Sequence, residues 1–356
     1  MSRQWKPKRV LVTASAQHED HGRAIVARCE AAGVTDIQLL SGDRLPPLRG
    51  DTARETYATA KSTLAVVTSS ASKRKLQRIP PSADWSFSLA EGCPAHCQYC
   101  YLAASLSGPP ITRVYADLPR ILANLDDYIG RGNVTTGTSD RDEEGTTFEA
   151  SCYTDPLGIE HVTGSLATTI EHFGSHDFGG PVQLRFTTKY DDVESLLALP
   201  HAGHTRVRFS VNSDDVAGRF EGGTASMPAR LTALRRMAEA GYPVGLTIAP
   251  IMPIEDWQSS YGTLLDDVAT ALDDIPDVDL TVECITHRFT PRSKDVLLDW
   301  YPRTKLEMDE ELRSIKRGKY GSVKHVYPRP VMRQLRSWFE ERISKQLPDA
   351  RLLYWT

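Results

Sequence analysis

The chain places three cysteines in one short run, EGCPAHCQYCYL, at Cys93, Cys97 and Cys100. This C-x3-C-x2-C spacing supplies three thiolates to one metal site and offers no obvious fourth. A cubane iron–sulfur cluster has four irons and is normally held by four cysteines, so three ligands would leave one iron with an open position. An open position is where a metal performs chemistry rather than structural support. We therefore predict a [4Fe-4S] cluster that can bind a further ligand.

Zinc is the main alternative for the same cysteines, with His96 or the distant Cys152 as the fourth ligand. Zinc motifs usually carry C-x2-C pairs in duplicate, and this run has only one such step. A disulfide is less favoured, because six cysteines in 356 residues are sparse and no apolar signal segment precedes them. The cluster is the preferred interpretation, and zinc stays open.

The cysteine spacing resembles that of the radical SAM enzymes, which implies S-adenosylmethionine bound at the open iron. A cluster at low potential can pass one electron into a bound sulfonium, which breaks a carbon–sulfur bond and releases an alkyl radical. The cofactor carries this hard step, and the protein holds and aims it.

Composition limits the classes of protein that the chain can belong to. Hydrophobic residues make up 40% and charged residues 25%, as in soluble globular proteins. No run is long enough to span a bilayer, and the missing signal segment predicts a cytoplasmic protein with no membrane partner. The net charge of −4 argues against a protein that coats nucleic acid nonspecifically.

Positive charge is nevertheless concentrated near the carboxyl end. No acidic residue lies between Leu312 and Phe339. The cations of this segment are Arg313, Lys316, Arg317, Lys319, Lys324, Arg329, Arg333 and Arg336. Within it, KRGKYGSVKHVYPRP predicts two short strands about a turn at Gly321, whose cations could bind phosphates while Tyr320 or Tyr327 stacks beside a displaced base. A solvated basic hairpin without a partner is the alternative.

Two parts are expected along the chain: a small α/β domain over residues 1–80 and a larger domain over residues 81–356. In the first part we expect a helix at Ala24–Gly33 and strands at Arg9–Ala14, Asp36–Leu40 and Thr63–Thr68. The basic stretch Ser72–Ser82 is interpreted as a linker.

From Trp85 onward, short strands alternate with helical segments. Six strands are expected, at Ser86–Ala90, Thr147–Asp155, Val182–Lys189, Arg206–Asn212, Pro243–Pro250 and Asp279–Thr286. This alternation predicts parallel βαβ units, and six units are too few to close an eight-stranded barrel. The fold class is therefore α/β, with a partial (β/α)6 TIM-like barrel, the small amino-terminal domain and a carboxy-terminal basic hairpin. In such barrels the chemistry gathers at the carboxyl ends of the strands, which here deliver Cys93, Cys152, Lys189, Ser210, Ala249 and His287 to one rim.

Cys152 is a candidate hydrogen donor because it lies near the rim end of its predicted strand. An S–H bond is weaker than most C–H bonds, so a thiol can quench a carbon radical, and Tyr99 or Tyr101 could then repair the thiyl radical. Ordinary core packing is the alternative for an isolated strand cysteine.

Six segments, in this order, resemble spore photoproduct lyase: EGCPAHCQYCYL, EASCYTDPLGIEH, RFTTKYDD, GHTRVRFSVN, GYPVGLTIAPI and KRGKYGSVKHVY. The resemblance runs from about Pro81 to the carboxyl end and is looser before it. It implies one [4Fe-4S] cluster and S-adenosylmethionine used catalytically to repair a cross-linked thymine dimer in DNA.

Residue by residue, the resemblance implies a role for each motif position. It gives Cys93, Cys97 and Cys100 as cluster ligands, Cys152 as hydrogen donor, and Tyr99 and Tyr101 as the radical relay. It gives Thr154, Lys189, Ser210 and Ala249 as contacts of S-adenosylmethionine, and Tyr320 as a tyrosine near the lesion. Two positions depart from the family pattern: Thr154 stands where serine is usual, and Tyr153 is bulkier than the usual threonine.

Three functions are therefore weighed. The preferred hypothesis is a DNA-repair lyase, with double-stranded DNA carrying a thymine dimer as substrate and a flavodoxin or ferredoxin as electron donor. Its candidate DNA contacts are Lys316, Arg317, Lys319 and Tyr320. A second hypothesis keeps the radical chemistry but changes the substrate to another lesion or a small molecule. A third is a noncatalytic, zinc-containing DNA-binding protein.

Overall fold

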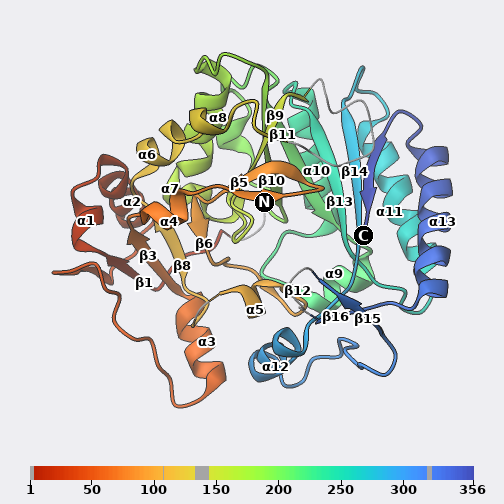
Figure 1. Cartoon of the computed structure of the whole chain (residues 1–356), viewed down its shortest axis with the longest axis horizontal. Coiled ribbons are helices and arrows are strands. Elements are labelled where there is room, and N and C mark those ends of the chain that lie inside the picture. The colour runs from red at the N-terminus through yellow and green to blue at the C-terminus, as the bar shows by residue number, and fades with distance from the viewer. Residues whose placement is uncertain (1–3, 107, 133–143, 319–322) are drawn as a thin grey trace.

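The computed structural model describes residues 4–106, 108–132, 144–318 and 323–356. Its larger sheet has eight strands in the order β17-β14-β13-β11-β10-β9-β5-β4 and curls into a half-barrel (Figure 1). The strands are β4 (Gln77–Ile79), β5 (Ala83–Phe87), β9 (Thr146–Ala150), β10 (Val182–Thr188), β11 (Thr205–Val211), β13 (Val244–Ile251), β14 (Leu280–Thr286) and β17 (Arg351–Trp355). The α/β partial barrel expected from the sequence is confirmed.

All six expected barrel strands form, and each pairs in parallel with its neighbour. The structure adds two strands that were not expected. The chain end forms β17, parallel to β14, and β4 pairs antiparallel with β5 at the other edge.

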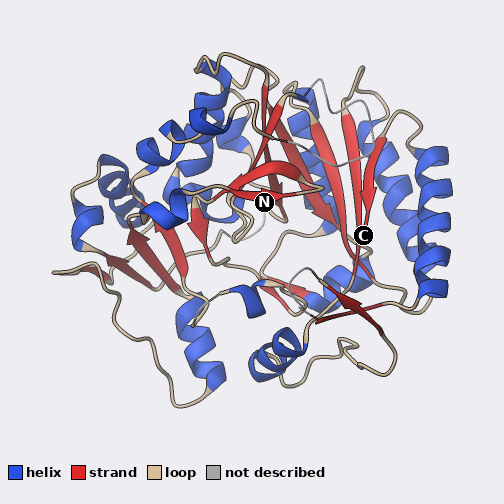
Figure 2. Cartoon of the chain, viewed as in Figure 1, coloured by secondary structure: helices blue, strands red, loops and turns tan. Residues whose placement is uncertain are grey.

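Helices cover the convex face of the half-barrel (Figure 2). They are α8 (Ser165–Ser175), α10 (Met227–Glu239), α11 (Trp257–Leu272) and α13 (Arg329–Gln346). Three other helices, α7 (Glu160–Thr163), α9 (Asp214–Phe220) and α12 (Pro291–Trp300), pack in separate apolar clusters away from this face. The connection after β10 departs from the expected alternation, since it contains only the 3-10 turn Glu194–Leu196. Apolar positions spaced at three and four residues, such as Leu335, Phe339 and Ile343 of α13, face inward and pack the helices on the sheet.

Alternation along a strand explains why the concave face is polar. In β11, Val207, Phe209 and Val211 belong to the apolar core. The intervening residues of the same strand include Arg208 and Ser210, which therefore point to the opposite, concave face. The half-barrel thus holds a charged interior against an apolar outer layer.

A second sheet of five strands, ordered β2-β1-β3-β8-β6, lies beside the half-barrel (Figure 1). Its strands are β1 (Arg9–Val12), β2 (Ile37–Leu39), β3 (Thr63–Val67), β6 (Ala90–Glu91) and β8 (Thr112–Tyr115). It carries helices α1 (Ala14–Gln17), α2 (Asp20–Ala31) and α3 (Ala53–Lys61). The strands and helix expected before residue 80 are present, and β6 and β8 join them from later in the chain. The domain division at residue 80 stays a prediction.

The cysteine run therefore leaves the half-barrel after β5 and passes along the small sheet before the chain returns at β9. The stretch before β5, Ser72–Ser82, is not the linker expected from sequence. It contains the end of the short helix α4 (Ala71–Arg74) and the whole of β4, because Ser70 caps that helix and β5 offers an edge for pairing.

The basic hairpin consists of β15 (Ser314–Arg317) and β16 (Val323–Val326), which pair antiparallel as expected. Its turn, with Lys319, Tyr320 and Gly321, lies outside the described residues, as does most of the polar stretch at 137–145. A bridge between Phe289 and His325 fastens the hairpin to the segment that follows β14. Of the helices described, none is long and apolar enough to cross a membrane.

Candidate active site

The cysteine loop is held from two sides. Its segment β7 (His96–Cys97) pairs antiparallel with β12 (Glu221–Gly222), which places Cys97 opposite Glu221. Gly92 has a φ of +84°, and a Cβ there would lie 2.2 Å from the carbonyl oxygen of Ile111, so only glycine fits. The Gly92 amide donates a 2.8 Å hydrogen bond to the carbonyl of Tyr153, which ties the loop to the turn after β9.

The three thiols lie in a partly dry, cation-flanked environment. Cys97 is buried, and Cys93 and Cys100 are half-buried. Burial raises the pKa of all three, for Cys93 to about 11, so binding metal here would displace protons. The Lys61 ammonium opposes this effect at Cys93 and Cys100, and Lys189 opposes it at Cys97.

These residues fit an anionic iron–sulfur cluster. Lys61 is 7% exposed and donates to the carbonyl oxygens of Cys93 and Ala95, so a buried cation sits against the loop that carries the thiolates. Soft thiolate ligands select iron–sulfur clusters and zinc. In the part of the chain that the structure describes, no three His, Cys, Asp or Glu side chains group closely enough to hold one metal ion. His96 is also engaged elsewhere, since its Nδ1 lies 2.9 Å from the Tyr57 hydroxyl in a hydrogen bond.

Lys189, Ser210 and Ala249 meet at the carboxyl ends of β10, β11 and β13. The Lys189 Nζ lies 2.6 Å from Ser210 Oγ, 3.3 Å from the carbonyl oxygen of Ala249 and 3.2 Å from Glu221 Oε1. We call these four residues the rim cluster. Parallel strands that end at one edge bring together three residues that are distant in sequence, as the barrel prediction required.

Glu221 was missed by sequence reasoning. Besides Lys189 it accepts hydrogen bonds from the Tyr99 hydroxyl and, at 2.6 Å, from Arg230 Nη2. Burial opposes ionisation, but Lys189 and Arg230 lower the pKa of Glu221 to about 2. The only sequence signal was a single acid in a glycine-rich stretch, so its position opposite Cys97 was not predictable.

The turn after β9 carries a polar group without a partner. The Thr154 hydroxyl is buried and has no hydrogen-bond partner in the described structure, which suits a position that contacts a ligand. The next residue, Asp155, was also missed. It accepts from the Lys189 amide at 2.7 Å and from the Thr188 hydroxyl at 2.8 Å, and burial raises its pKa to about 6. Asp155 thus fastens this turn to the end of β10.

Cys152 lies in the same turn. Ser151, just before it, adopts a left-handed conformation with a φ of +59°, an uncommon geometry for a residue with a side chain. The Ser151 hydroxyl accepts a 3.0 Å hydrogen bond from the Leu89 amide, which helps to fix that geometry. Burial, and then the charge of Glu149, raise the pKa of Cys152 well above its usual range, so it carries its hydrogen at neutral pH.

The two tyrosines occupy different places. The Tyr101 hydroxyl donates to the carbonyl oxygen of Cys152, which brings this phenol to the turn that carries the candidate hydrogen donor. Tyr99 reaches the rim cluster: its hydroxyl donates to Glu221, and the Lys189 ammonium lies 5.6 Å from its ring centroid. Between them they connect the Cys152 turn with the rim cluster.

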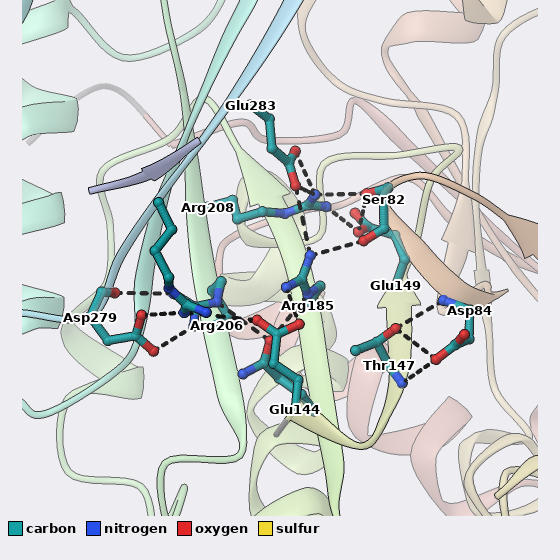
Figure 3. A network of polar contacts seen from close by, with 12 residues as sticks. Ser82, Asp84, Glu144, Thr147, Glu149, Arg185, Arg206, Arg208, Asp279 and Glu283 are labelled. Atoms are coloured by element: carbon teal, nitrogen blue, oxygen red, sulfur yellow. Dashed lines mark hydrogen bonds and ion pairs between the residues drawn. The ribbon is translucent and has the colours of Figure 1, made fainter. Parts of the chain in front are cut away.

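A buried charge network lines the concave face near Cys152 (Figure 3). Arg208 bonds both oxygens of Glu283 at 2.8 Å, and it also bonds Glu149. Arg185 bonds Glu144 at 2.7 Å. Charges this deeply buried are tolerable only when paired and hydrogen-bonded, so the network forms a rigid polar floor. Its signal in the sequence is arginine at alternate strand positions, as at Arg206 and Arg208.

The hairpin presents cations outward. Lys316 and Arg317 are exposed, and neither forms an ion pair within the described residues. Burial, with the neighbouring cations Arg288 and Lys316, lowers the pKa of Lys324. Lys319 and Tyr320 lie outside the described residues, so their predicted contacts are not placed.

Two further residues named from the sequence, His287 and Tyr327, are held by neighbouring groups of the protein. His287 is 2% exposed, and its amide donates to the carbonyl oxygen of Ile251 at 3.0 Å, so it lies buried at the end of β14. Tyr327 is half-buried, and the guanidinium carbon of Arg313 lies over its ring, 3.7 Å from the ring centroid. Cys29 and Cys284 are fully buried core residues.

The family model described as spore photoproduct lyase matches residues 5–356. The chain belongs to the spore photoproduct lyase family. Spore photoproduct lyase of a Geobacillus species is 39% identical over 350 residues, covering 98% of each chain, and that of Bacillus subtilis is 36% identical over the whole of both chains.

Solved structures of spore photoproduct lyase have the same fold. One, a double mutant with bound AdoMet and dinucleoside spore photoproduct, superposes with a TM-score of 0.90 at 36% identity, covering 99% of this chain and all of the other. A complex with the dinucleoside spore photoproduct alone also gives 0.90, at 37% identity. The match extends through the amino-terminal sheet, where the sequence resemblance was looser. Membership in a lyase family makes the chain an enzyme, so the hypothesis of a noncatalytic zinc protein is wrong.

Proposed function

We propose that this chain is a radical SAM lyase that reverses the spore photoproduct in DNA to two thymines. The observation that carries the proposal is the meeting, at one end of the half-barrel, of three loop thiols, the rim cluster and the Cys152 turn. The relative solved with AdoMet and the dinucleoside lesion supports the same assignment, because it shares the fold over nearly the whole chain.

Each part of the site has a distinct role in the proposal. Cys93, Cys97 and Cys100 hold the cluster. Lys189, Ser210, the carbonyl of Ala249 and the unpartnered hydroxyl of Thr154 orient S-adenosylmethionine. When bound, the cluster and S-adenosylmethionine would supply a carbon-centred radical able to take one hydrogen atom from the lesion, so that the bond between the thymines can break.

Cys152 then returns a hydrogen atom to the product radical. The thiol S–H bond breaks, a C–H bond forms on the thymine, and a thiyl radical stays on Cys152. Because burial keeps the thiol protonated, the hydrogen is present when needed. Tyr101 restores the thiol by giving up its phenolic hydrogen, and Tyr99 carries the oxidising equivalent toward the rim cluster, where it would be used up as S-adenosylmethionine is re-formed.

DNA binding is assigned to the hairpin. Lys316 and Arg317, together with Lys319, would neutralise phosphates, and Tyr320 would lie beside the lesion. A lesion inside a duplex must be extruded to reach a buried thiol, at a cost of a few kcal/mol that damage reduces. The electron donor is a flavodoxin or ferredoxin, which places the reaction in the cytoplasm.

Anaerobic turnover tests the proposal. Reconstituted protein with reductant and S-adenosylmethionine should convert the lesion in dry-irradiated DNA, or the dinucleoside lesion, to thymine. Cleavage of S-adenosylmethionine without any loss of lesion would favour the second hypothesis, a radical SAM enzyme with another substrate. A colourless protein with bound zinc would refute both.

A further inference from the structure

A cavity of about 470 Å³ lies against the cysteine loop, apart from the rim cluster and the Cys152 turn. It is built where three distant segments meet: helix α3, the cysteine loop and the chain after α12. Its lining includes Arg54, Tyr57, Lys61, His96, Tyr301 and Arg303. We call it the loop cavity.

The inner wall of the loop cavity touches the loop that carries the cluster ligands. Tyr57 bonds His96, which stands between Cys93 and Cys97, and Lys61 bonds the carbonyl of Cys93. Burial chiefly, and then the neighbouring Tyr301, raise the pKa of Tyr57. The same side chains therefore face the cavity on one side and the cysteine loop on the other.

Aromatic rings make this wall continuous. The ring centroid of Tyr57 lies 4.7 Å from Trp300, 5.4 Å from Tyr301 and 5.8 Å from His96. Packed rings beside a redox centre leave little room for water between that centre and a bound partner protein. Such a wall is suited to close approach by the edge of another redox cofactor.

Charge at the loop cavity is positive. Arg54, Lys61 and Arg303 line it, and no carboxylate is among the lining residues. Arg54 and Arg303 are exposed, and the structure gives neither an ion pair within its described residues. In a chain with a net charge of −4, a local group of unpaired cations favours an acidic partner and speeds its encounter.

We propose that the loop cavity is the docking surface for the electron donor, a small acidic protein that carries a one-electron cofactor. This rests on the proposed function, since a cluster of this kind must be reduced before turnover can begin. The donor loses one electron and the cluster gains one, with no bond made or broken. Contacts between redox proteins are small and short-lived, which suits a shallow charged site of this size.

DNA is the competing occupant of a basic surface, and the geometry disfavours it. The lesion must reach Cys152, and no residue of the Cys152 turn or of β15 and β16 lines the loop cavity. The aromatic rings that line the cavity against the cysteine loop would also not contribute to binding a phosphate.

Stopped-flow reduction of the cluster tests the docking surface directly. Anaerobic holoenzyme is mixed with a reduced bacterial flavodoxin, and the loss of cluster absorbance is followed for wild type, Arg54→Glu, Arg303→Glu and the double variant. Steering by a charged surface changes association rates by about 10- to 1,000-fold, so the double variant should react at least about tenfold more slowly. Arg44→Glu, an exposed arginine outside the cavity, is the matched control and should behave as wild type.

Dithionite separates docking from damage to the cluster. The double variant should keep its iron content and should be reduced by dithionite within about twofold of the wild-type rate, since this small reductant needs no docking surface. Rising salt should slow the flavodoxin reaction of wild type more than that of the double variant. An unchanged flavodoxin rate in the double variant would overturn the proposal. So would a loss of duplex affinity in that variant, measured by fluorescence anisotropy, because the surface would then belong to DNA. A wild-type protein that neither reductant can reduce would instead sink the proposed function.

Discussion

The rim cluster and the basic hairpin hold charge in opposite ways. In the rim cluster, Lys189 and Glu221 are almost enclosed, and each bonds several partners. In the hairpin, Lys316 and Arg317 are exposed and have no acidic partner within the described residues. Enclosed, paired charges are held in position before a ligand binds, whereas exposed cations without an acidic partner are available to bind an anion from outside the protein. The chain thus separates the machinery that holds a small cofactor from the surface that holds a polyanion.

This contrast predicts different effects for mutations in the two regions. Changes at the cysteine loop, the Cys152 turn and the rim cluster should alter chemistry or folding whatever the length of the substrate. Changes at the hairpin should matter only when the substrate has a long phosphate backbone.

The largest effect is expected for Cys97→Ala. With one of three thiolates lost, the cluster should not assemble, and cleavage of S-adenosylmethionine should fall below detection. Iron and sulfide analysis with anaerobic absorbance spectra measures this. Cys29→Ala is the matched control, since this buried cysteine packs in the small sheet's core and should leave the cluster intact. Full iron content in Cys97→Ala would refute the ligand assignment.

Cys152→Ala should separate the two halves of the reaction. Cleavage of S-adenosylmethionine should continue, while intact thymine falls to a minor fraction of the products, because the lesion radical no longer finds its hydrogen donor. Chromatography of products from the dinucleoside lesion measures the ratio. Cys284→Ala, a core cysteine of β14, is the control and should repair normally.

The pH dependence of the same product ratio sharpens this test. An ordinary thiol loses its hydrogen near pH 8.5. Burial and Glu149 raise the pKa of Cys152 well above that range, so the wild-type thymine yield should stay flat from pH 7 to about 9. A yield that halves near pH 8.5 would show an exposed, ordinary thiol and contradict the enclosed turn.

The sequence was sufficient for the framework of this site. Short apolar runs bounded by turn residues, such as Pro243–Pro250, predict strands. Since the ends of parallel strands share one edge, the meeting of Lys189, Ser210 and Ala249 followed from the strand boundaries alone. The strand β17 was not predictable, because it forms from the far end of the chain and depends on β14 for its pairing.

Hydrogen-bond partners from distant segments were equally unpredictable from the sequence. Lys61 lies at the end of α3 and reaches the carbonyl of Cys93 across 32 positions of sequence. Glu221 reaches the Tyr99 hydroxyl across 122 positions. Neither residue belongs to a motif, and each becomes meaningful only when the small sheet and the half-barrel are packed together.

Glu221→Gln should reduce activity less than the cysteine changes do, but it should lower the free energy of unfolding of the whole protein. A pKa lowered from the ordinary 4.5 to about 2 corresponds to about 3 kcal/mol of folding free energy at 1.36 kcal/mol per pKa unit. Because the folded pKa lies below the unfolded one, this stabilisation is complete above pH 4.5 and is lost as the pH falls toward 2. Urea unfolding at pH 7 and at lower pH should show a difference between wild type and variant that narrows below pH 4.5.

The control for Glu221 is an exposed ion pair. Glu194→Gln removes the partner of Arg236 on the surface, where such pairs are worth about 0–1 kcal/mol. If Glu194→Gln and Glu221→Gln destabilised the protein equally, the rim cluster would be no better enclosed than the surface.

The smallest effect, and the one that defines the other side of the comparison, is expected for Lys316→Ala combined with Arg317→Ala. Each phosphate contact contributes about 0.9 to the slope of log affinity against log salt, so losing two should reduce that slope by about 2. Fluorescence anisotropy with duplex DNA at several salt concentrations measures the slope, and turnover of the dinucleoside lesion should stay at the wild-type level. Arg333→Ala, an exposed arginine of the same basic segment on α13, is the control and should leave the slope unchanged. Equal loss on the dinucleoside and on the duplex would place the hairpin inside the reaction site, and the separation of cofactor site from phosphate surface would no longer hold.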